Sequence, residues 1–196
     1  NQYSEPFYIR NNTVIKSKAF SVSGKQSYSS ATSSARFYKF PNNWKIKINS
    51  TYNSMYNAGG SEGLIDGIRG DVNWRKGDWQ GYQGQNLELV IDLVNERSIS
   101  SLSAGFLQDS RSWIVMPKNV IFEVSTDGVQ FEKLPVILND VSERNFDILK
   151  KDFSLKVQKN KVRYVRLKAE SYGVLPEWHN GAGGNAFIFI DEVIID

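Results

Sequence analysis

The sequence predicts an all-β protein built as a β-sandwich, and three observations lead to this prediction. Short runs rich in β-branched and aromatic residues recur along the chain, and Gly, Asn, Asp and Ser separate them. Basic and apolar residues alternate between Lys156 and Lys168, as in a strand with one face in water. Asp127 and Gly128 stand between two such runs, where this pair readily forms a tight hairpin turn.

The strands expected from these runs cover most of the chain. In order they are Thr13 to Phe20, Lys45 to Ile48, Leu87 to Leu93, Ile99 to Phe106, Val120 to Ser125, Gln130 to Leu134, Val162 to Ala169 and Ala186 to Ile195. The Ser-rich segment from Gly24 to Ala35 is expected to be a loop or an exposed hairpin tip. The stretch from Phe37 to Trp44 contains Pro41 and reads as a junction, so a domain boundary is expected near Lys39.

Composition narrows the function classes. Apolar residues make up 40% and charged residues 23% of the 196 residues, as in a folded soluble protein. The 24 basic residues nearly balance 21 acidic ones and are scattered, so no nucleic-acid partner is expected. No apolar run approaches the roughly 20 residues of a membrane span. The chain has no cysteine, no visible signal peptide and no initiator methionine, so we expect an excised fragment of a longer protein.

Catalytic motifs are not apparent. The single histidine makes a serine or cysteine triad improbable, since such triads need an imidazole base. The GAGG sequence at Gly181 to Gly184 precedes an expected strand, whereas phosphate-binding glycine loops open a helix. A pair of hydrolytic carboxylates would need a specific separation, and the candidates stand in no specific motif. These candidates are Asp71, Asp78, Asp109 and Glu177.

Four tryptophans fall in connecting segments and indicate sugar binding. An indole ring can carry the C–H face of a sugar while polar side chains at its edge bind the hydroxyls. Polar neighbours of this kind accompany Trp79, Trp113 and Trp178, whereas Trp74 is expected in the core. Each ring could instead roof the end of the sandwich, and the single histidine could be a hydrogen-bonded structural residue.

One short segment could bind a hard cation. The sequence LIDGIRGD places Asp66 and Asp71 within six residues, among glycines that favour a tight turn. Calcium prefers carboxylate and carbonyl oxygens in such turns. A solvated Asp-Gly turn without an ion is the alternative that the residues alone leave open.

Three blocks in order resemble a known family. They are GLIDGIRGDVNWRKGDWQGYQGQNLELVIDL, SAGFLQDSRSWIVMPKNVIFEVSTDGVQF and VRYVRLKAESYGVLPEWHNGAGGNAFIFIDEVII. Together they resemble the coagulation-factor type C, or discoidin, domain, in the version appended to bacterial family 20 β-hexosaminidases, the chitobiases. The resemblance covers roughly Phe40 to Asp196 and rests on separated blocks in the same order. The segment SEPFYIRNNTVIKSKAFSVSGKQS resembles the last strands of the small β-sandwich that precedes this module.

The resemblance implies a domain plan and a fold. Residues 1–39 would be the remnant of a small β-sandwich domain with its linker, and residues 40–196 the discoidin-like module. That module would be a jelly-roll-like, galactose-binding-domain-like β-sandwich of about eight main strands. It would be monomeric and catalytically silent, with an upstream catalytic domain on the same polypeptide, and it would be extracellular, periplasmic or at the cell surface of a bacterium.

The resemblance also implies ligands. A structural calcium ion would be held by Asp66, Asp71, Glu192 and a carbonyl such as that of Arg69. Glycans of the galactose or N-acetylhexosamine type would bind to loops at one end of the sandwich. The residues expected there are Trp79, Gln80, Gln108, Trp113, Trp178 and His179.

Two functions therefore compete. The first is a noncatalytic carbohydrate-binding module that holds a glycoside hydrolase near its substrate. The alternative is a structural module that docks on the parent catalytic domain, for which Trp79, Trp113 and Trp178 would form one contiguous apolar patch. Membrane or protein adhesion would need apolar spikes or a basic face, and the sequence shows neither clearly.

Overall fold

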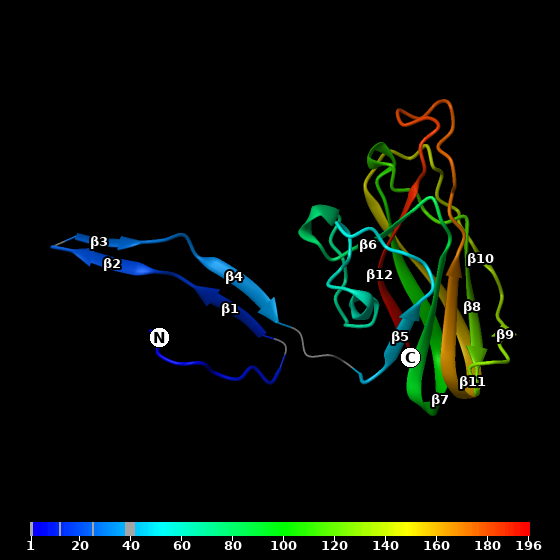
Figure 1. Ribbon diagram of the computed structural model, residues 1–196, viewed down its shortest axis with the longest axis horizontal. Helices are drawn as coiled ribbons and strands as arrows, with labels where there is room; N and C mark the ends of the chain where they lie inside the picture. The colour runs from blue at the N-terminus through cyan, green and yellow to red at the C-terminus, as the bar shows by residue number, and fades with distance from the viewer. Residues whose placement is uncertain (1, 12, 25, 38–41) are drawn as a thin grey trace. The chain divides into compact units, whose positions relative to one another are not determined.

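The computed structural model describes residues 2–11, 13–24, 26–37 and 42–196. The chain divides into two compact units, residues 1–40 and residues 41–196 (Figure 1). The expected boundary at Lys39 lies outside the described residues. In both units the regular structure is almost entirely β. No helix within the described ranges is both long and apolar enough to cross a membrane.

The first unit is a pair of two-stranded antiparallel ribbons. Strand β1 (Thr13–Ser17) pairs with β4 (Ser33–Phe37), and β2 (Phe20–Ser23) pairs with β3 (Gln26–Ser29). The Ser-rich segment thus holds a hairpin tip and also most of two strands. Every described side chain of this unit is exposed or half-buried, so its described part has no core of its own.

The second unit contains one continuous hydrogen-bonded sheet that is folded into two layers. Its strands run in the order β10-β8-β11-β7-β12-β6, with β5 on β7 and β9 on β8. The bounds are β5 Lys45–Ile48, β6 Gln80–Gln83, β7 Leu87–Gln108, β8 Asn119–Ser125, β9 Glu132–Lys133, β10 Ile137–Leu138, β11 Leu149–Ala169 and β12 Phe187–Ile195. This architecture confirms the predicted all-β sandwich.

Two long strands, β7 and β11, connect the layers. Residues 87–92 of β7 pair with β5 and with residues 164–169 of β11, whereas residues 102–107 pair with β12 and with residues 150–155 of β11. The register of β11 against β7 shifts between Lys156 and Tyr164, where both strands bend. Val94 and Lys161 have positive φ angles of 69° and 57° in these bends. The two expected strands Leu87 to Leu93 and Ile99 to Phe106 are therefore the two arms of β7.

Several strand boundaries differ from the sequence-based expectation. Strand β11 begins at Leu149, well before the expected Val162. The sequence-based expectation missed its first arm because that arm carries many lysines that face water. The expected strand Gln130 to Leu134 shrinks to β9. Strand β6 was not expected, because the sequence QGYQ has no β-branched residue. The turn expected at Asp127 and Gly128 is present, with Gly128 at a φ of 74°.

The main core lies between the two layers. Phe106 on β7 and Phe153 on β11 are fully buried, and their rings meet edge to face with centroids 5.3 Å apart. Leu89 from the other arm of β7, Phe122 from β8 and Ile188 from β12 belong to the same cluster. Burial of such side chains provides most of the stabilisation of a small domain.

We predict that Phe106→Ala destabilises the second unit by about 3–5 kcal/mol, because it removes a buried ring and leaves a cavity. Urea unfolding followed by tryptophan fluorescence measures the effect, since all five tryptophans lie in this unit. Phe20→Ala is the control, because that ring is 72% exposed and its loss should change stability by less than about 0.5 kcal/mol. Equal stability of the two variants would contradict the core assignment.

Candidate functional site

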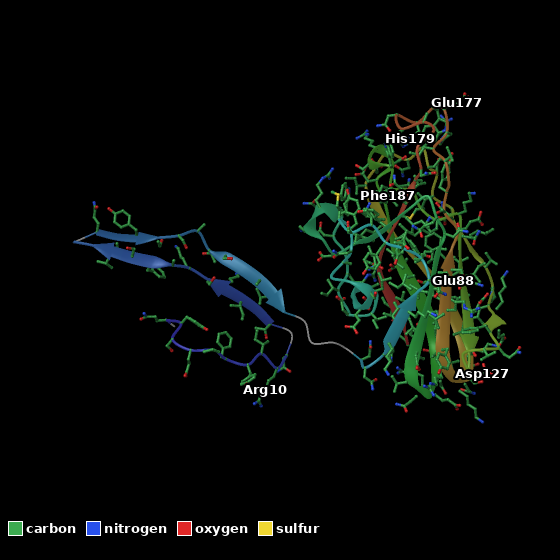
Figure 2. The ribbon with its side chains drawn as sticks, in the orientation of Figure 1. Arg10, Glu88, Asp127, Glu177, His179 and Phe187 are labelled. Carbon is green, nitrogen blue, oxygen red and sulfur yellow. The ribbon has the colours of Figure 1, made fainter. Side chains whose placement is uncertain are left out.

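Three loops meet at one end of the second unit. The first follows β7 and contains the 3-10 helix η3 (Ser110–Ser112), the second precedes β11, and the third joins β11 to β12. Figure 2 shows Glu177 and His179 on the third loop at this end, while Asp127 marks the opposite end. Loops at the end of a rigid sheet are common sites of binding.

Gln108, the last residue of β7, attaches the second loop to the sheet. Its side chain is fully buried. The Nε2 group donates to the carbonyls of Ser142, at 2.8 Å, and Asn145, at 3.1 Å. The Oε1 atom accepts from the backbone N–H of Met116 at 3.3 Å. Gln108 was expected to contact a ligand, and the structure instead uses its whole amide for backbone hydrogen bonds.

Ser110 and His179 attach the other two loops to each other. The Ser110 hydroxyl donates to the carbonyl of Glu143 at 2.7 Å, and the Ser110 carbonyl lies 2.6 Å from His179 Nε2. His179 Nδ1 accepts from the N–H of Gly181 at 3.0 Å, so Nε2 carries the proton and donates to Ser110. The ring is 4% exposed and both nitrogens are occupied. His179 is therefore placed as a structural link rather than as a catalytic base or a ligand contact.

The indole ring of Trp113 packs against the glycines of the third loop. Trp113 has a positive φ of 66° at the end of η3, and its ring packs with Tyr172 on a small cluster of buried residues. A Cβ atom added to Gly181 would lie 2.3 Å from the indole, and one added to Gly184 would lie 2.8 Å from it. The glycines of GAGG are thus needed for close packing against a half-buried tryptophan.

One accessible group of side chains at this end comprises Arg111, Arg144, Phe146 and Trp178, which we call the aromatic–arginine cluster. The guanidinium of Arg144 lies 4.4 Å from the Trp178 ring centroid, and that of Arg111 lies 5.5 Å from the Phe146 centroid. The Phe146 and Trp178 rings meet edge to face with centroids 6.3 Å apart. Phe146 is 43% exposed and Trp178 is half-buried.

Two members of this cluster were missed by the sequence-based prediction. Arg144 and Phe146 lie in the polar segment NDVSERNFD, which has no motif and no neighbouring tryptophan. Arg111 stood out only through its proximity to Trp113. The one aromatic residue of this polar segment is the signal that could have drawn attention to the loop, because an accessible ring can carry the C–H face of a sugar.

Trp79 and Gln80 lie inside the protein and away from the cluster. The Trp79 ring is 1% exposed and its Nε1 donates to the carbonyl of Asp71 at 2.8 Å. Gln80 is fully buried and donates to the carbonyls of Asn57 and Gly60, each at 3.0 Å. In this structure neither side chain offers a surface to a sugar. Trp74 is buried with Trp79, as expected for a core residue.

The four residues expected to hold calcium occupy different environments. Asp66 accepts the N–H of Ile68 at 2.8 Å, and Glu192 accepts the N–H of Gly67 at 3.1 Å. The second Glu192 oxygen, Oε2, is buried and has no hydrogen-bond partner. Burial, helped by the nearby charges of Asp66 and Asp191, raises the pKa of Glu192 to about 8. Among the described residues no group of three or more His, Cys, Asp or Glu side chains is arranged to hold a metal ion.

The side chains of the other two residues form ion pairs, whereas the ligand expected from Arg69 is its backbone carbonyl. Arg69 pairs with Asp191 at 2.9 Å and with Asp152, so its guanidinium neutralises a buried carboxylate. Asp71 pairs with Lys76 at 2.8 Å, and this contact lowers the pKa of Asp71. The structure thus brings Asp66 and Glu192 together and directs the side chain of Asp71 to a lysine.

Comparison with known proteins places the chain in a sequence family. A family model described as the F5/8 type C domain matches residues 45–188, which is nearly three quarters of the chain. None of the curated proteins compared with the chain matches it.

The chain is similar to several solved structures. A fucose-binding module of Streptococcus pneumoniae matches with a TM-score of 0.51 and 14% identity, covering 80% of this chain and 92% of that one. CBM32-1 from a family 31 glycoside hydrolase of Clostridium perfringens gives 0.48 and 16%, covering 80% and 95%. The C-terminal domain of a chitobiase from Bacteroides fragilis gives 0.45 and 20%, covering 81% and 95%. The first of these likenesses supports a common β-sandwich fold.

We predict that His179→Ala destabilises the second unit by about 2–4 kcal/mol, because it leaves the Ser110 carbonyl and the Gly181 N–H without partners and opens a cavity. Urea unfolding measures the loss. The matched control is Asn180→Ala, which changes an exposed neighbour on the same loop and should cost less than about 0.5 kcal/mol. A neutral effect of His179→Ala would rule out its linking role.

Proposed function

The chain belongs to the F5/8 type C domain family, and from this premise we propose that residues 41–196 form a noncatalytic carbohydrate-binding module. The observation that supports the proposal is the aromatic–arginine cluster, in which two accessible rings and two guanidinium groups lie at one loop end. A shallow surface of this composition suits a sugar, which has both an apolar C–H face and hydroxyl groups.

The chemistry assigns a role to each part of the cluster. The C–H face of a sugar ring packs against the accessible parts of Trp178 and Phe146. The guanidinium groups of Arg111 and Arg144 donate hydrogen bonds to hydroxyl or ring oxygens. Glu177 and Asn180 are exposed on the third loop next to Trp178, where they can accept and donate further hydrogen bonds.

The loops are held in place before a ligand arrives. Gln108, Ser110 and His179 are buried and bind the backbone of all three loops, so little conformational entropy is lost on binding. Even so, a site with two rings gives a dissociation constant of about 0.1–1 mM. Such a module acts by keeping a tethered enzyme near its substrate, which raises the effective substrate concentration.

We propose glycans of the galactose or N-acetylhexosamine type as ligands. We further propose that the parent protein is a glycoside hydrolase of the chitobiase or β-hexosaminidase kind, located outside the cytoplasm of a bacterium. The support for these finer statements is the resemblance of the three sequence blocks to modules of such enzymes. Chemistry on the substrate would then belong to the separate catalytic domain of that enzyme.

The apolar patch that the docking alternative requires is not formed in this structure. That alternative required Trp79, Trp113 and Trp178 to form one contiguous apolar patch. Trp79 is inside the protein, and Trp113 is half-buried against Gly181 and Gly184. The accessible ring of Trp178 has a cationic guanidinium beside it, so it is not part of a contiguous apolar patch.

We also propose a structural calcium ion beside Asp66 and Glu192. The unpartnered buried oxygen of Glu192 fits this group, because a buried carboxylate needs a positive partner or hydrogen-bond donors. Asp66 would supply a second carboxylate, and backbone carbonyls and water would supply the remaining oxygens that calcium requires. Asp71 and the Arg69 side chain are not part of this set, since both are ion-paired.

We predict that galactose, N-acetylgalactosamine, N-acetylglucosamine or their oligomers shift amide resonances of the three loops in an NMR titration. Trp178→Ala should lower affinity about 5- to 10-fold, since stacking on an aromatic ring contributes about 1–1.5 kcal/mol. Tyr8→Ala is the control because that ring is 94% exposed in the first unit and should leave affinity unchanged. If no saccharide of the panel shifts any resonance, the galactose or N-acetylhexosamine ligand class fails.

We predict that calcium raises the melting temperature and that a chelator reverses the change. An ion at about 100 times its dissociation constant adds about 2.7 kcal/mol of stability when it binds only the folded state. For a domain of this size that corresponds to about 5–10 °C. Glu192→Gln should abolish the calcium response, and magnesium should not reproduce it. A melting temperature that is independent of calcium would remove the metal site.

A further inference from the structure

We propose that the aromatic–arginine cluster selects saccharides that carry a negative charge, with Arg144 and Arg111 as the specificity-determining residues. The favoured ligands are sugars with a carboxylate, such as uronic acids, and a sulfate ester is the other source of the same charge. This inference rests on the proposed carbohydrate-binding function and names the ligand class of that site. Its starting point is how the two arginines are placed.

Arg144 occupies part of the surface that a neutral sugar would use. Its guanidinium lies 4.4 Å from the centroid of the Trp178 ring, as in a cation–π contact. A neutral sugar that stacks on that face must displace the guanidinium. An acidic sugar can leave the Arg–Trp contact in place and bind the N–H groups of the guanidinium, which match a carboxylate in two parallel hydrogen bonds.

Neither arginine of the cluster has a carboxylate partner among residues 42–196. By contrast Arg69, Arg163 and Arg166 each pair with an acidic side chain at about 3 Å. Within this range no ion pair or side-chain hydrogen bond involves either guanidinium, and each lies near an aromatic ring. Their positive charges and their N–H donors are therefore free for a ligand.

The buried residues beneath the loop restrict where Arg144 can go. Its backbone N–H donates to the Ser142 hydroxyl at 3.2 Å, and Gln108 binds the carbonyls of Ser142 and Asn145 on either side of it. The carbonyl of Glu143 is bound by Ser110. Arg144 thus projects from a fixed turn, which reduces the entropy lost when its guanidinium binds an anion.

Acidic side chains on the same loops repel an anionic ligand, so removing one of them should raise the affinity for that ligand. Asp109 accepts hydrogen bonds from Trp74 and Ser112, and Asp140 pairs with Lys151, so both are already engaged. Glu143, Asp147 and Glu177 remain. Glu177 is exposed and adjacent to Trp178, so its charge is screened by water and salt but still repels an anionic ligand at low ionic strength.

The test uses pairs of oligosaccharides that differ only in charge. The probes are trimers of galacturonic acid, glucuronic acid and mannuronic acid, each beside its carboxyl-reduced neutral form, and galactose 6-sulfate beside galactose. Isothermal titration calorimetry or NMR on the full chain measures each affinity. For at least one pair we expect the acidic member to bind about 10-fold tighter in low salt, with the gap shrinking at about 0.5 M salt. The comparison of galactose 6-sulfate with galactose shows whether a sulfate ester is bound in place of a carboxylate.

Variants locate the effect. Arg144→Gln should lower affinity for the acidic member about 10-fold and that for its neutral form far less, with Arg111→Gln acting in the same direction. Glu177→Gln should raise affinity for the acidic member about 2-fold, because it removes a repelling charge. The matched control is Arg97→Gln, since Arg97 also lies over a tryptophan, Trp44, at 5.7 Å, but in the bend of β7 outside the three loops.

Each other outcome overturns the proposal in a distinguishable way. If neutral members bind as well as acidic ones, the charge selectivity fails while the carbohydrate-binding function stands. If acidic members bind tighter but Arg144→Gln and Arg111→Gln leave the gap unchanged, the assignment to these arginines fails. If no probe, neutral or acidic, binds at any concentration that the calorimeter can reach, both this inference and the proposed function fail together.

Discussion

The arrangement of the loop end depends on the need to satisfy buried polar groups where β7 ends. Gln108 and Ser110 lie in the interior, and their hydrogen bonds reach the backbone of a loop more than thirty residues further along the chain. His179 joins the third loop to the same point. An unpaired polar group at this depth would cost about 1–3 kcal/mol, so the three loops are held in one arrangement. The accessible cluster above them is a consequence of that arrangement.

The same constraint explains why the tryptophans of the chain divide into two groups. Trp74 and Trp79 come from loops, yet both are buried because their loops fold over the edge of the sheet and meet Phe189 on β12. Each of their indole N–H groups finds a partner inside, Asp109 and the carbonyl of Asp71 respectively. Trp178 is the tryptophan whose ring meets both a guanidinium and the exposed Phe146. Position in a loop therefore does not decide exposure.

A second buried polar region lies on the other side of the sheet, where β12 carries two successive acids. Asp191 is neutralised by Arg69 and by the N–H of Gly70, although burial still raises the pKa of Asp191. Glu192 has one backbone donor and one oxygen without a partner. The register of β12 against β7 shifts at these two acids, and Arg69 pairs with Asp191. Asp191 Oδ1 also lacks a hydrogen-bond partner, so what sets the two acids apart is the ion pair of Asp191 with Arg69.

The sequence by itself determined the fold class, because strand alternation, Asp-Gly turns and β-branched runs are local properties that survive in any β-sandwich. It also predicted that the third loop, with its tryptophan and glycines, belongs to the candidate binding end. Only the tertiary structure decided which side chains are accessible there. The sequence suggested Gln108 and His179 as ligand contacts, but in the structure their side chains hydrogen-bond to the backbone of the loops. Arg144 and Phe146 lie in a polar segment without a motif, yet they contribute to the accessible cluster. The physical reason is that burial and hydrogen-bond partners depend on residues distant in the chain, which no local pattern records.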